Sequence, residues 1–418
     1  MGAIKKFLRD KNILLLWSTR AFSRFGDAME MLALLYLVYD ITGSGLAMGS
    51  LMLFSVLPNA IISPIAGVVS DKYNKNKIMF VSEMVRTVCI IFIPILMVTN
   101  LIELWHIYTI SVLVSIAESF FEPTAGTAMV LVVGKKDMPV FNSVATISNH
   151  IMRILGYSLS GILIATVGKE IIFVIDGITF LASALAALFI KIPFKENISS
   201  EKSPHFMIEL IEGFKYVFTN KIIIAILFVI LMIEFLGTPL QIYIPLIIER
   251  VLKVKTVWSG YFATATIVGA IIGNILYPIL NKTFIKLHHI YLVGILILGL
   301  FIGGCGYIIN PIYYTAMFFI SGLVSSLIGV WSFTEIQMRV DTSYLGRVVS
   351  IVTMVMLISS PLAGVVFGGL ADKVYIPTIF KYLSVIWVIV AIISYISIKL
   401  SYRKNKDEML NQESVNLN

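Results

Sequence analysis

Charged residues and cysteines are scarce in this chain of 418 residues. Charged side chains make up 13% of the sequence, whereas 58% of the residues are hydrophobic and the mean hydropathy is +0.93. A soluble protein of this length has too little interior to bury so much apolar surface. Only two cysteines occur, Cys89 and Cys305, both inside apolar segments, so we expect neither a disulfide framework nor a cysteine metal site.

The sequence patterns of common catalytic and cofactor sites are also absent. There is no Gly-x-x-x-x-Gly-Lys-Ser/Thr loop for ATP, no His-Glu-x-x-His and no paired cysteine or histidine ligand spacing. We therefore expect no enzyme activity, no cofactor and no metal, and any ATP-driven process would need another subunit. The net charge of +8 does not indicate nucleic-acid binding, because the basic residues lie in short breaks between apolar runs.

Long apolar runs dominate what is present. A membrane-spanning helix needs about 20 mostly apolar residues, and runs of that length repeat along most of the chain. They predict an all-α membrane protein with twelve transmembrane helices. The expected spans lie near residues 13–40, 44–70, 78–98, 103–133, 139–167, 170–192, 221–249, 256–281, 288–309, 311–338, 345–371 and 376–400.

One long polar connection divides these spans into two sets of six. The predicted organisation is an N-terminal six-helix bundle (1–192), a cytoplasmic linker with an amphipathic helix (193–220), a C-terminal six-helix bundle (221–402) and a polar cytoplasmic tail (403–418). Ser203-Pro204 is typical of the start of the linker helix. Lysine and arginine gather on one side of the predicted spans, which predicts that both termini lie in the cytoplasm. The first apolar segment is too long for a signal peptide, carries charged residues and lacks a small-residue cleavage site, so we expect it to be retained as the first span.

Charged residues inside the apolar runs are the first candidates for function. A charge at the bilayer centre costs about 2.5–3.5 kcal/mol on insertion scales, so such groups face a water-filled path or a partner. This pattern favours transport. The acids are Asp27 and Glu30 in the first span, Glu118 and Glu122 in the fourth, and Glu234 in the seventh.

Motifs along most of the chain give a family resemblance. Gly67-x-x-x-Asp71-Lys72-x-x-x-x-Lys77 closes the second span. With six-plus-six spans and a long central connection, it resembles the loop 2–3 signature of the major facilitator superfamily. Other matches resemble its macrolide-efflux-like branch of drug and metabolite exporters: Arg20-x-x-Ser23-x-x-Gly26-Asp27, Glu83-Met-Val-Arg86, Glu122-Pro123, Glu212-Gly213-Phe214-Lys215-Tyr216, Leu345-Gly346-Arg347-Val348, Pro361-Leu-Ala-Gly364 and Leu370-Ala371-Asp372.

The two halves also echo each other faintly. Gly49 parallels Gly260, and the Gly156 to Gly161 stretch has a counterpart in Pro361 to Gly364. The chain departs from a related branch of proton-coupled antiporters, since its fourth span has no arginine and its fifth lacks the Gly-Pro motif. The residues that couple protons to transport in that branch therefore have no counterpart here, and the resemblance to it does not predict proton antiport for this chain.

The resemblance implies two pseudo-symmetric bundles with a central cavity lined by spans 1, 4, 7 and 10. Asp27, the deepest acid, is the first proton-coupling candidate, followed by Glu30, Glu118, Glu122 and Glu234. Arg20 and Arg24 are charge partners that either neutralise Glu118 or Glu122 or leave them free to titrate. His150 and Arg153 either bind an anionic group or make a polar contact with a neighbouring span. Asp176 is expected at the membrane interface.

Two further groups are conformational candidates. Gly67, Asp71, Lys72 and Lys77 form a predicted latch, in which Gly67 allows a close helix approach and Asp71 faces a helix N-terminus; the alternative is an ordinary basic loop. Glu335 and Arg339, one helical turn apart, form a predicted gate or structural pair.

The expected function is export of amphipathic small molecules, such as macrolide-like drugs or metabolites, by alternating access with proton antiport. Lipid, lysolipid, siderophore or peptide transport is the alternative, followed by a non-transporting membrane scaffold or enzyme. We expect the protein to lie in a bacterial cytoplasmic membrane as a monomer. Its expected partners are the substrate, protons and membrane lipids, and we expect no binding of nucleic acid. The sequence leaves the charge of the substrate open.

Overall fold

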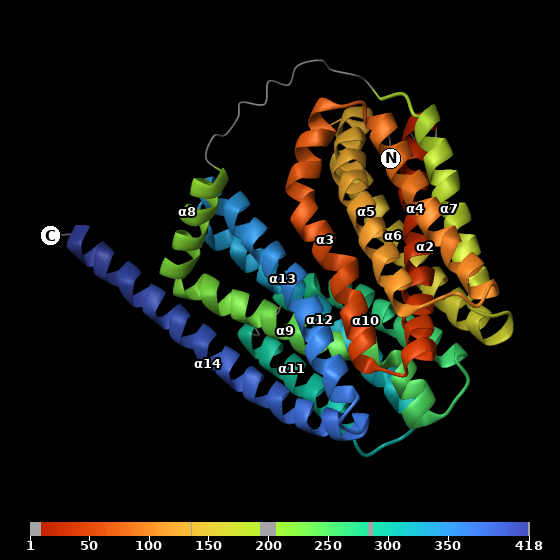
Figure 1. The fold of residues 1–418 in the computed structure, drawn as a ribbon. Coiled ribbons are helices and arrows are strands. Elements are labelled where there is room, and N and C mark those ends of the chain that lie inside the picture. Colours follow the sequence, from red (N-terminus) through yellow and green to blue (C-terminus); the bar gives the residue numbers. More distant parts are fainter. Residues whose placement is uncertain (1–9, 135, 193–205, 283–286, 417–418) are drawn as a thin grey trace. The chain divides into compact units, whose positions relative to one another are not determined.

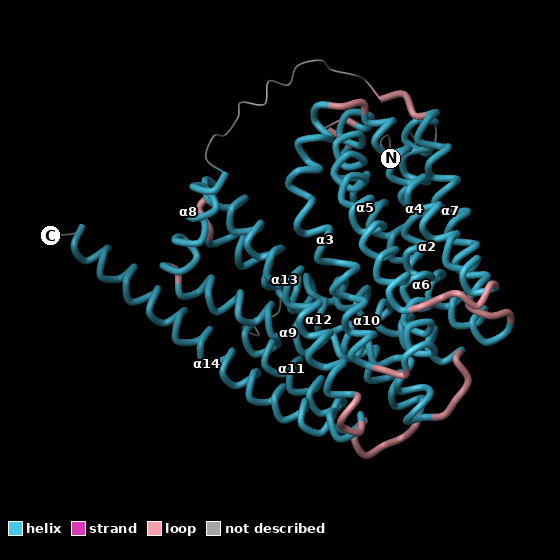
Figure 2. Tube along the Cα trace, in the orientation of Figure 1, coloured by secondary structure: helices cyan, strands magenta, loops and turns pink. Residues whose placement is uncertain are grey.

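The computed structural model describes residues 10–134, 136–192, 206–282 and 287–416, and these residues are almost entirely helical (Figures 1 and 2). No strand occurs in these ranges. Twelve of the helices match the predicted spans. They are α2 (Lys11–Thr42), α3 (Gly45–Lys72), α4 (Lys75–Val98), α5 (Leu104–Val133), α6 (Met138–Thr166), α7 (Glu170–Phe189), α9 (Lys221–Leu246), α10 (Val257–Lys282), α11 (Leu287–Gly304), α12 (Pro311–Arg339), α13 (Thr342–Ala371) and α14 (Ile376–Asn416).

A thirteenth helix, α8 (Phe206–Thr219), lies in the predicted linker, and a π-helical turn, η1 (Ile247–Leu252), extends α9. The predicted start of the linker helix at Ser203-Pro204 lies outside the described residues. Within the described ranges, nine helices are long and apolar enough to cross a membrane by length and composition. α2 is not among the nine, and its middle carries Arg20, Arg24, Asp27 and Glu30.

Helix boundaries follow the local capping chemistry. The side chain of Asp10 accepts backbone hydrogen bonds at the start of α2, and Asn74 and Asn310 do the same for α4 and α12. Gly43 caps the C-terminal end of α2, and its φ of 62° is a left-handed conformation that glycine adopts at little cost. Two ends differ most from the prediction: α11 stops at Gly304 instead of 309, and α14 stays helical to Asn416 instead of 400.

The described chain forms two compact units. Unit 1 combines the N-terminal helices with Ile242–Thr264 and Gly364–Asp372, whereas unit 2 holds Lys202–Gln241, Ala265–Ala363 and the C-terminal segment from Lys373. The predicted bundles, 1–192 and 221–402, divide the chain at the linker. The two units instead group residues by their spatial contacts, so their bounds do not test the predicted bundles. The division into bundles therefore stays a prediction.

α2 runs through the interior of unit 1. It packs against α5, α6 and α7, while α4 packs against α5 and α7 and α3 against α5. Most of the second half of α2, from Ala28 to Val38, is buried. The charged side chains in the middle of α2 are therefore close to α5 and α7, where they can meet partners on these helices.

Two glycine crossings bring the C-terminal segments of unit 1 onto its N-terminal helices. On α3, a Cβ atom at Gly49 would collide with the carbonyl oxygen of Gly364, on the segment of α13 in unit 1. On α6, a Cβ atom at Gly161 would lie 2.8 Å from the backbone nitrogen of Gly260 in α10. These are the positions at which the two sequence halves echo each other, so the faint repeat corresponds to two helix crossings.

Asp372 ties the end of α13 to the start of α3. Its carboxylate accepts hydrogen bonds from the Ser44 hydroxyl (2.6 Å) and from the backbone N–H groups of Gly45 (2.5 Å) and Leu46 (3.0 Å). Arg250 donates to the carbonyl oxygens of Gly43 and Ala371 beside it. Partial burial acts to raise the pKa of Asp372, but these hydrogen bonds and the charge of Arg250 outweigh it and lower that pKa below its ordinary value.

In unit 2, α8 is anchored on the first turns of α13. Glu212 pairs with Arg347 at 3.0 Å, and the rings of Tyr216 and Tyr344 stack with centroids 4.5 Å apart. These residues belong to, or adjoin, two motifs more than a hundred positions apart in the sequence. On α8, Ile211 and Phe218 are exposed, as expected for a helix with one apolar face free to meet a membrane surface.

Candidate functional site

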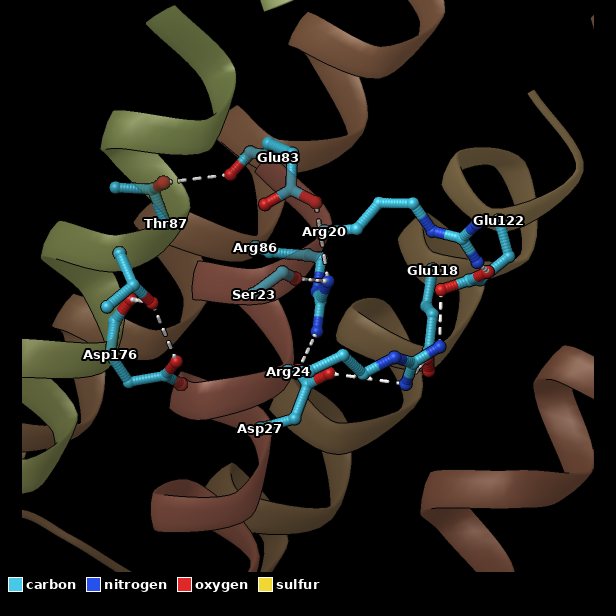
Figure 3. Close-up of polar contacts among 11 residues, drawn as sticks. Arg20, Ser23, Arg24, Asp27, Glu83, Arg86, Thr87, Glu118, Glu122 and Asp176 are labelled. Atoms are coloured by element: carbon cyan, nitrogen blue, oxygen red, sulfur yellow. Dashed lines mark hydrogen bonds and ion pairs between the residues drawn. The ribbon is translucent and has the colours of Figure 1, made fainter. Parts of the chain in front are cut away.

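The candidate site is a network of charged side chains inside unit 1, centred on α2. Arg20 Nη2 lies 2.7 Å from Glu122 Oε2 on α5. Arg24 pairs with the other oxygen of Glu122 and lies 3.4 Å from an oxygen of Glu118. The alternative in which Arg20 and Arg24 neutralise the acids of the fourth span is therefore the one observed. Figure 3 shows both arginines reaching from α2 toward α5.

Arg86 on α4 extends the network to the other side of α2. Its guanidinium group pairs with Asp27, donates to Ser23 Oγ at 3.0 Å and lies 3.4 Å from Glu83 Oε1 (Figure 3). The guanidinium carbon sits 3.9 Å from the centre of the Phe180 ring on α7, a cation–π contact. Asp27 also contacts Arg24 at 3.4 Å. The first-ranked acid is thus held between two guanidinium groups.

A pair of carboxyl groups lies beyond Asp27, one on α2 and one on α7. Glu30 of α2 is 7% exposed and interacts electrostatically with Asp176 of α7, which is fully buried. Gly26, one turn before Glu30, leaves room for Asp176, because a Cβ atom there would collide with Asp176 Oδ1. α7 turns Asp176 toward α2, as Figure 3 shows, so this residue is part of the network, and its expected place at the membrane interface stays a prediction.

The remaining predicted residues make no contact that would include them in this network within the described residues. Glu234 is half-buried on α9 in unit 2, and His150 is half-buried on α6. Arg153 is exposed, with its guanidinium carbon 5.9 Å from the Tyr157 ring centre on its own helix. Within the described residues, no ion pair joins these three side chains to another residue. The structure brings Arg20, Arg24, Asp27, Glu118 and Glu122 together, but not Glu234, His150 or Arg153.

A family model, that of the Major Facilitator Superfamily, matches residues 16–364. This match covers far more than half of the sequence and agrees with the arrangement of twelve long helices. The chain belongs to the major facilitator superfamily.

Similar proteins fall within the same superfamily. The chain is 25% identical to the MFS-type transporter YfiS of Bacillus subtilis, over 94% of this chain and 95% of that protein. It is 21% identical to macrolide efflux protein A of Streptococcus pyogenes, over 86% of this chain and 89% of that protein. The predicted resemblance is confirmed, and the chain is a multi-pass membrane transporter.

Solved transporter structures share the fold. A variant of the nucleoside transporter NupG superposes with a TM-score of 0.70 at 11% identity, over 93% of this chain and 99% of that one. A bacterial homologue of the lysosomal transporter Spinster, in an inward-facing conformation, gives a TM-score of 0.67 at 12% identity, over 93% and 94%. At these identities the likeness concerns the fold alone, and it confirms the predicted major facilitator fold.

The conformational candidates of this major facilitator chain have a mixed outcome. Glu335 and Arg339 form an ion pair of 2.6 Å on α12, and their role as a gate stays a prediction. Among the described residues, no atom lies within 4 Å of a Cβ placed on Gly67, so the close helix approach expected there is not seen in this part of the chain. Lys72 and Lys77 are exposed, and the side chain of Asp71 lies outside the described residues. The latch also stays a prediction.

Sequence reasoning gave no site role to three members of the network: Glu83, Arg86 and Asp176. The resemblance places the cavity-lining charges on spans 1, 4, 7 and 10, whereas these residues lie on the third and sixth spans. A signal was available, because an acid and an arginine three positions apart inside an apolar helix have to be paired or buried together. For Asp176, the sequence holds no comparable partner nearby.

Proposed function

We propose that this transporter exports amphipathic small molecules, macrolides among them, across a bacterial cytoplasmic membrane by alternating access with proton antiport. The single observation that carries the substrate class is the similarity to macrolide efflux protein A along 86% of the chain. The charged network on α2, α4, α5 and α7 supports coupling to an ion, because charge buried at this depth is costly to keep without a function.

The network suggests how a proton would be coupled to transport. Its ion pairs hold α2 against α4 and α5, so protonation of one acid would release an arginine and change the balance among the pairs. Protons moving inward supply about 2.3 kcal/mol for each charge that crosses about 100 mV. In this proposal both termini lie in the cytoplasm, the protein acts as a monomer, and Gly67, Asp71, Lys72 and Lys77 act as the latch.

The experiment uses erythromycin as the probe. We expect expression of the chain in a macrolide-susceptible bacterium to raise the inhibitory concentration several-fold over the empty vector. Inverted membrane vesicles should take up radiolabelled erythromycin when their interior is made acidic, and collapse of the pH gradient should stop uptake. Unchanged susceptibility together with no uptake would contradict macrolide export.

The same vesicles distinguish the alternatives. Uptake of a fluorescent lysolipid that persists without a proton gradient would favour lipid movement and contradict antiport. Asp27→Asn tests the first-ranked acid, since undiminished proton-driven uptake in this variant would remove Asp27 from the coupling residues. The variant Glu249→Gln, which changes an exposed acid of η1 outside the network, is the matched control.

A further inference from the structure

The charged network holds more acid than base. It contains six carboxyl groups, those of Asp27, Glu30, Glu83, Glu118, Glu122 and Asp176, but only three guanidinium groups, those of Arg20, Arg24 and Arg86. Asp27 and Glu122 each contact two arginines, and Glu83 and Glu118 contact one each. No arginine contacts Glu30 or Asp176 within the described part of the chain.

The hydrogen bonding of Asp176 is incomplete. Its Oδ1 is 3.3 Å from the Thr179 hydroxyl, whereas its fully buried Oδ2 accepts no hydrogen bond from any described group. The neighbouring side chain is Glu30, another carboxyl group, and two carboxylates facing each other have no hydrogen to share. A single proton placed between them completes the hydrogen bonding of Asp176 and removes the repulsion of two like charges in contact.

We propose that Glu30 and Asp176 form one shared proton-binding site. Asp176 carries the proton on its unpartnered oxygen and donates it to the carboxylate of Glu30. Glu30 is the less buried of the two, so it is the side from which a proton arrives from water and to which it returns. No bond other than O–H forms or breaks.

Other charged groups surround the pair on each packed helix. Asp27 on α2 and Glu118 on α5 add negative charge, and Arg86 on α4 adds positive charge. The Cys89 thiol on α4 also faces Glu30. Asp27 is a poorer proton carrier by geometry, because protonation there would weaken its two existing ion pairs, whereas protonation of the Glu30–Asp176 pair weakens none. The role of this proton in antiport rests on the proposed function, but proton binding itself does not.

Infrared difference spectroscopy of the full-length protein in lipid tests the site without a substrate. As the pH is raised from about 5 to about 9, a protonated carboxyl band of the wild type should disappear. We expect Glu30→Gln and Asp176→Asn each to remove this band, and Glu249→Gln to keep it. A band retained in both single variants, or removed only by Glu83→Gln, would overturn the proposal.

A variant in which the two acids are exchanged controls for loss of the band through misfolding of the single variants. Glu30→Asp combined with Asp176→Glu keeps two carboxyl groups in the same place, so this double variant should regain the band. Absence of the band in a swapped variant that elutes as wild type does on size exclusion would count against a shared proton.

A transport experiment tests whether proton binding at this site is coupled to export. In vesicles, Asp176→Asn should lower gradient-driven erythromycin accumulation to the equilibrium level while downhill movement continues at the wild-type rate. Accumulation that still responds to the gradient as in the wild type would overturn coupling through the pair. If the wild type moves no erythromycin at all, the proposed function fails, and the infrared result still decides whether the proton site exists.

Discussion

At the residue scale, the stability of this protein depends strongly on buried charged residues that must keep their partners. Arg86 is 2% exposed and faces Asp27, Glu83 and the Phe180 ring, so it offsets the charge of a partly buried and of a fully buried carboxyl group. Removing one partner of a buried ion pair leaves the other charge uncompensated, which costs about 3–5 kcal/mol. Arg86 is thus a structural centre of the network as well as a neighbour of the proposed proton site.

Replacing Arg86 should therefore destabilise the protein strongly. We expect Arg86→Met to lower the free energy of unfolding by about 3 kcal/mol or more, measured as thermal unfolding in detergent. Arg153→Met is the matched control, because Arg153 is exposed and a surface substitution usually changes stability by about 0.5 kcal/mol or less. Equal melting temperatures for the two variants would show that the Arg86 contacts contribute little.

Gly26 gives a second test at the residue scale. A Cβ atom there would collide with Asp176 Oδ1 and lie 2.5 Å from Thr179 Oγ1, so Gly26→Ala should push α7 away from α2. Overpacking of this kind costs about 1–3 kcal/mol.

Gly126→Ala is the control for this test, because no atom lies within 4 Å of a Cβ at Gly126 on α5. Alanine in an open helical position is favoured by up to about 1 kcal/mol. The two substitutions should therefore shift the melting temperature in opposite directions. Equal shifts would contradict the close packing of Asp176 on α2.

At the scale of elements, the sequence predicted the helices better than their contacts. The starts of α5, α6 and α12 fall within one residue of the predicted starts, because apolar runs and capping residues are local signals. The pairing of Arg86 with Asp27, or of Glu30 with Asp176, joins segments that are far apart in the sequence. No periodicity reports such a contact, since it depends on which faces of two helices meet.

The connection between α3 and α13 has a pH dependence that follows from Asp372. Its hydrogen bonds lower its pKa below the ordinary value of about 3.9. The carboxylate therefore stabilises the connection fully above that ordinary value, and the stabilisation is lost as the pH falls through the lowered pKa. Between about pH 5 and about pH 8 the connection should not respond to pH through this group.

Removing the carboxylate should weaken the same connection at every pH. Loss of a helix cap costs about 1 kcal/mol. Asp372→Ala should therefore increase several-fold the fraction of molecules in which the start of α3 has separated from the end of α13. Spin labels at the exposed positions Leu46 and Leu370 report the distance between the two helices. With Glu249→Gln as the control, an unchanged distance distribution in Asp372→Ala would contradict a capping role.

At the scale of the whole molecule, alternating access requires that some helix contacts seen in one conformation be broken in another. The contact of α3 with the unit 1 segment of α13 is a candidate, because Gly45 and Gly49 bring the two backbones together there. Leu46 touches the position that a Cβ atom at Gly369 would occupy, at 3.6 Å. The atom that comes this close is Cδ1 of Leu46. We expect cysteines at these two positions to form a disulfide under oxidising conditions while the contact is closed.

This crosslink provides the last prediction. If export depends on opening of the α3–α13 contact, the oxidised Leu46→Cys, Gly369→Cys variant should lose erythromycin uptake in inverted vesicles, and a reducing agent should restore it. Each single-cysteine variant, treated in the same way, controls for oxidation of Cys89 and Cys305 and for the substitutions themselves. Full transport in the crosslinked protein would mean that this contact stays closed throughout the cycle, and the moving contacts would then lie elsewhere in the chain.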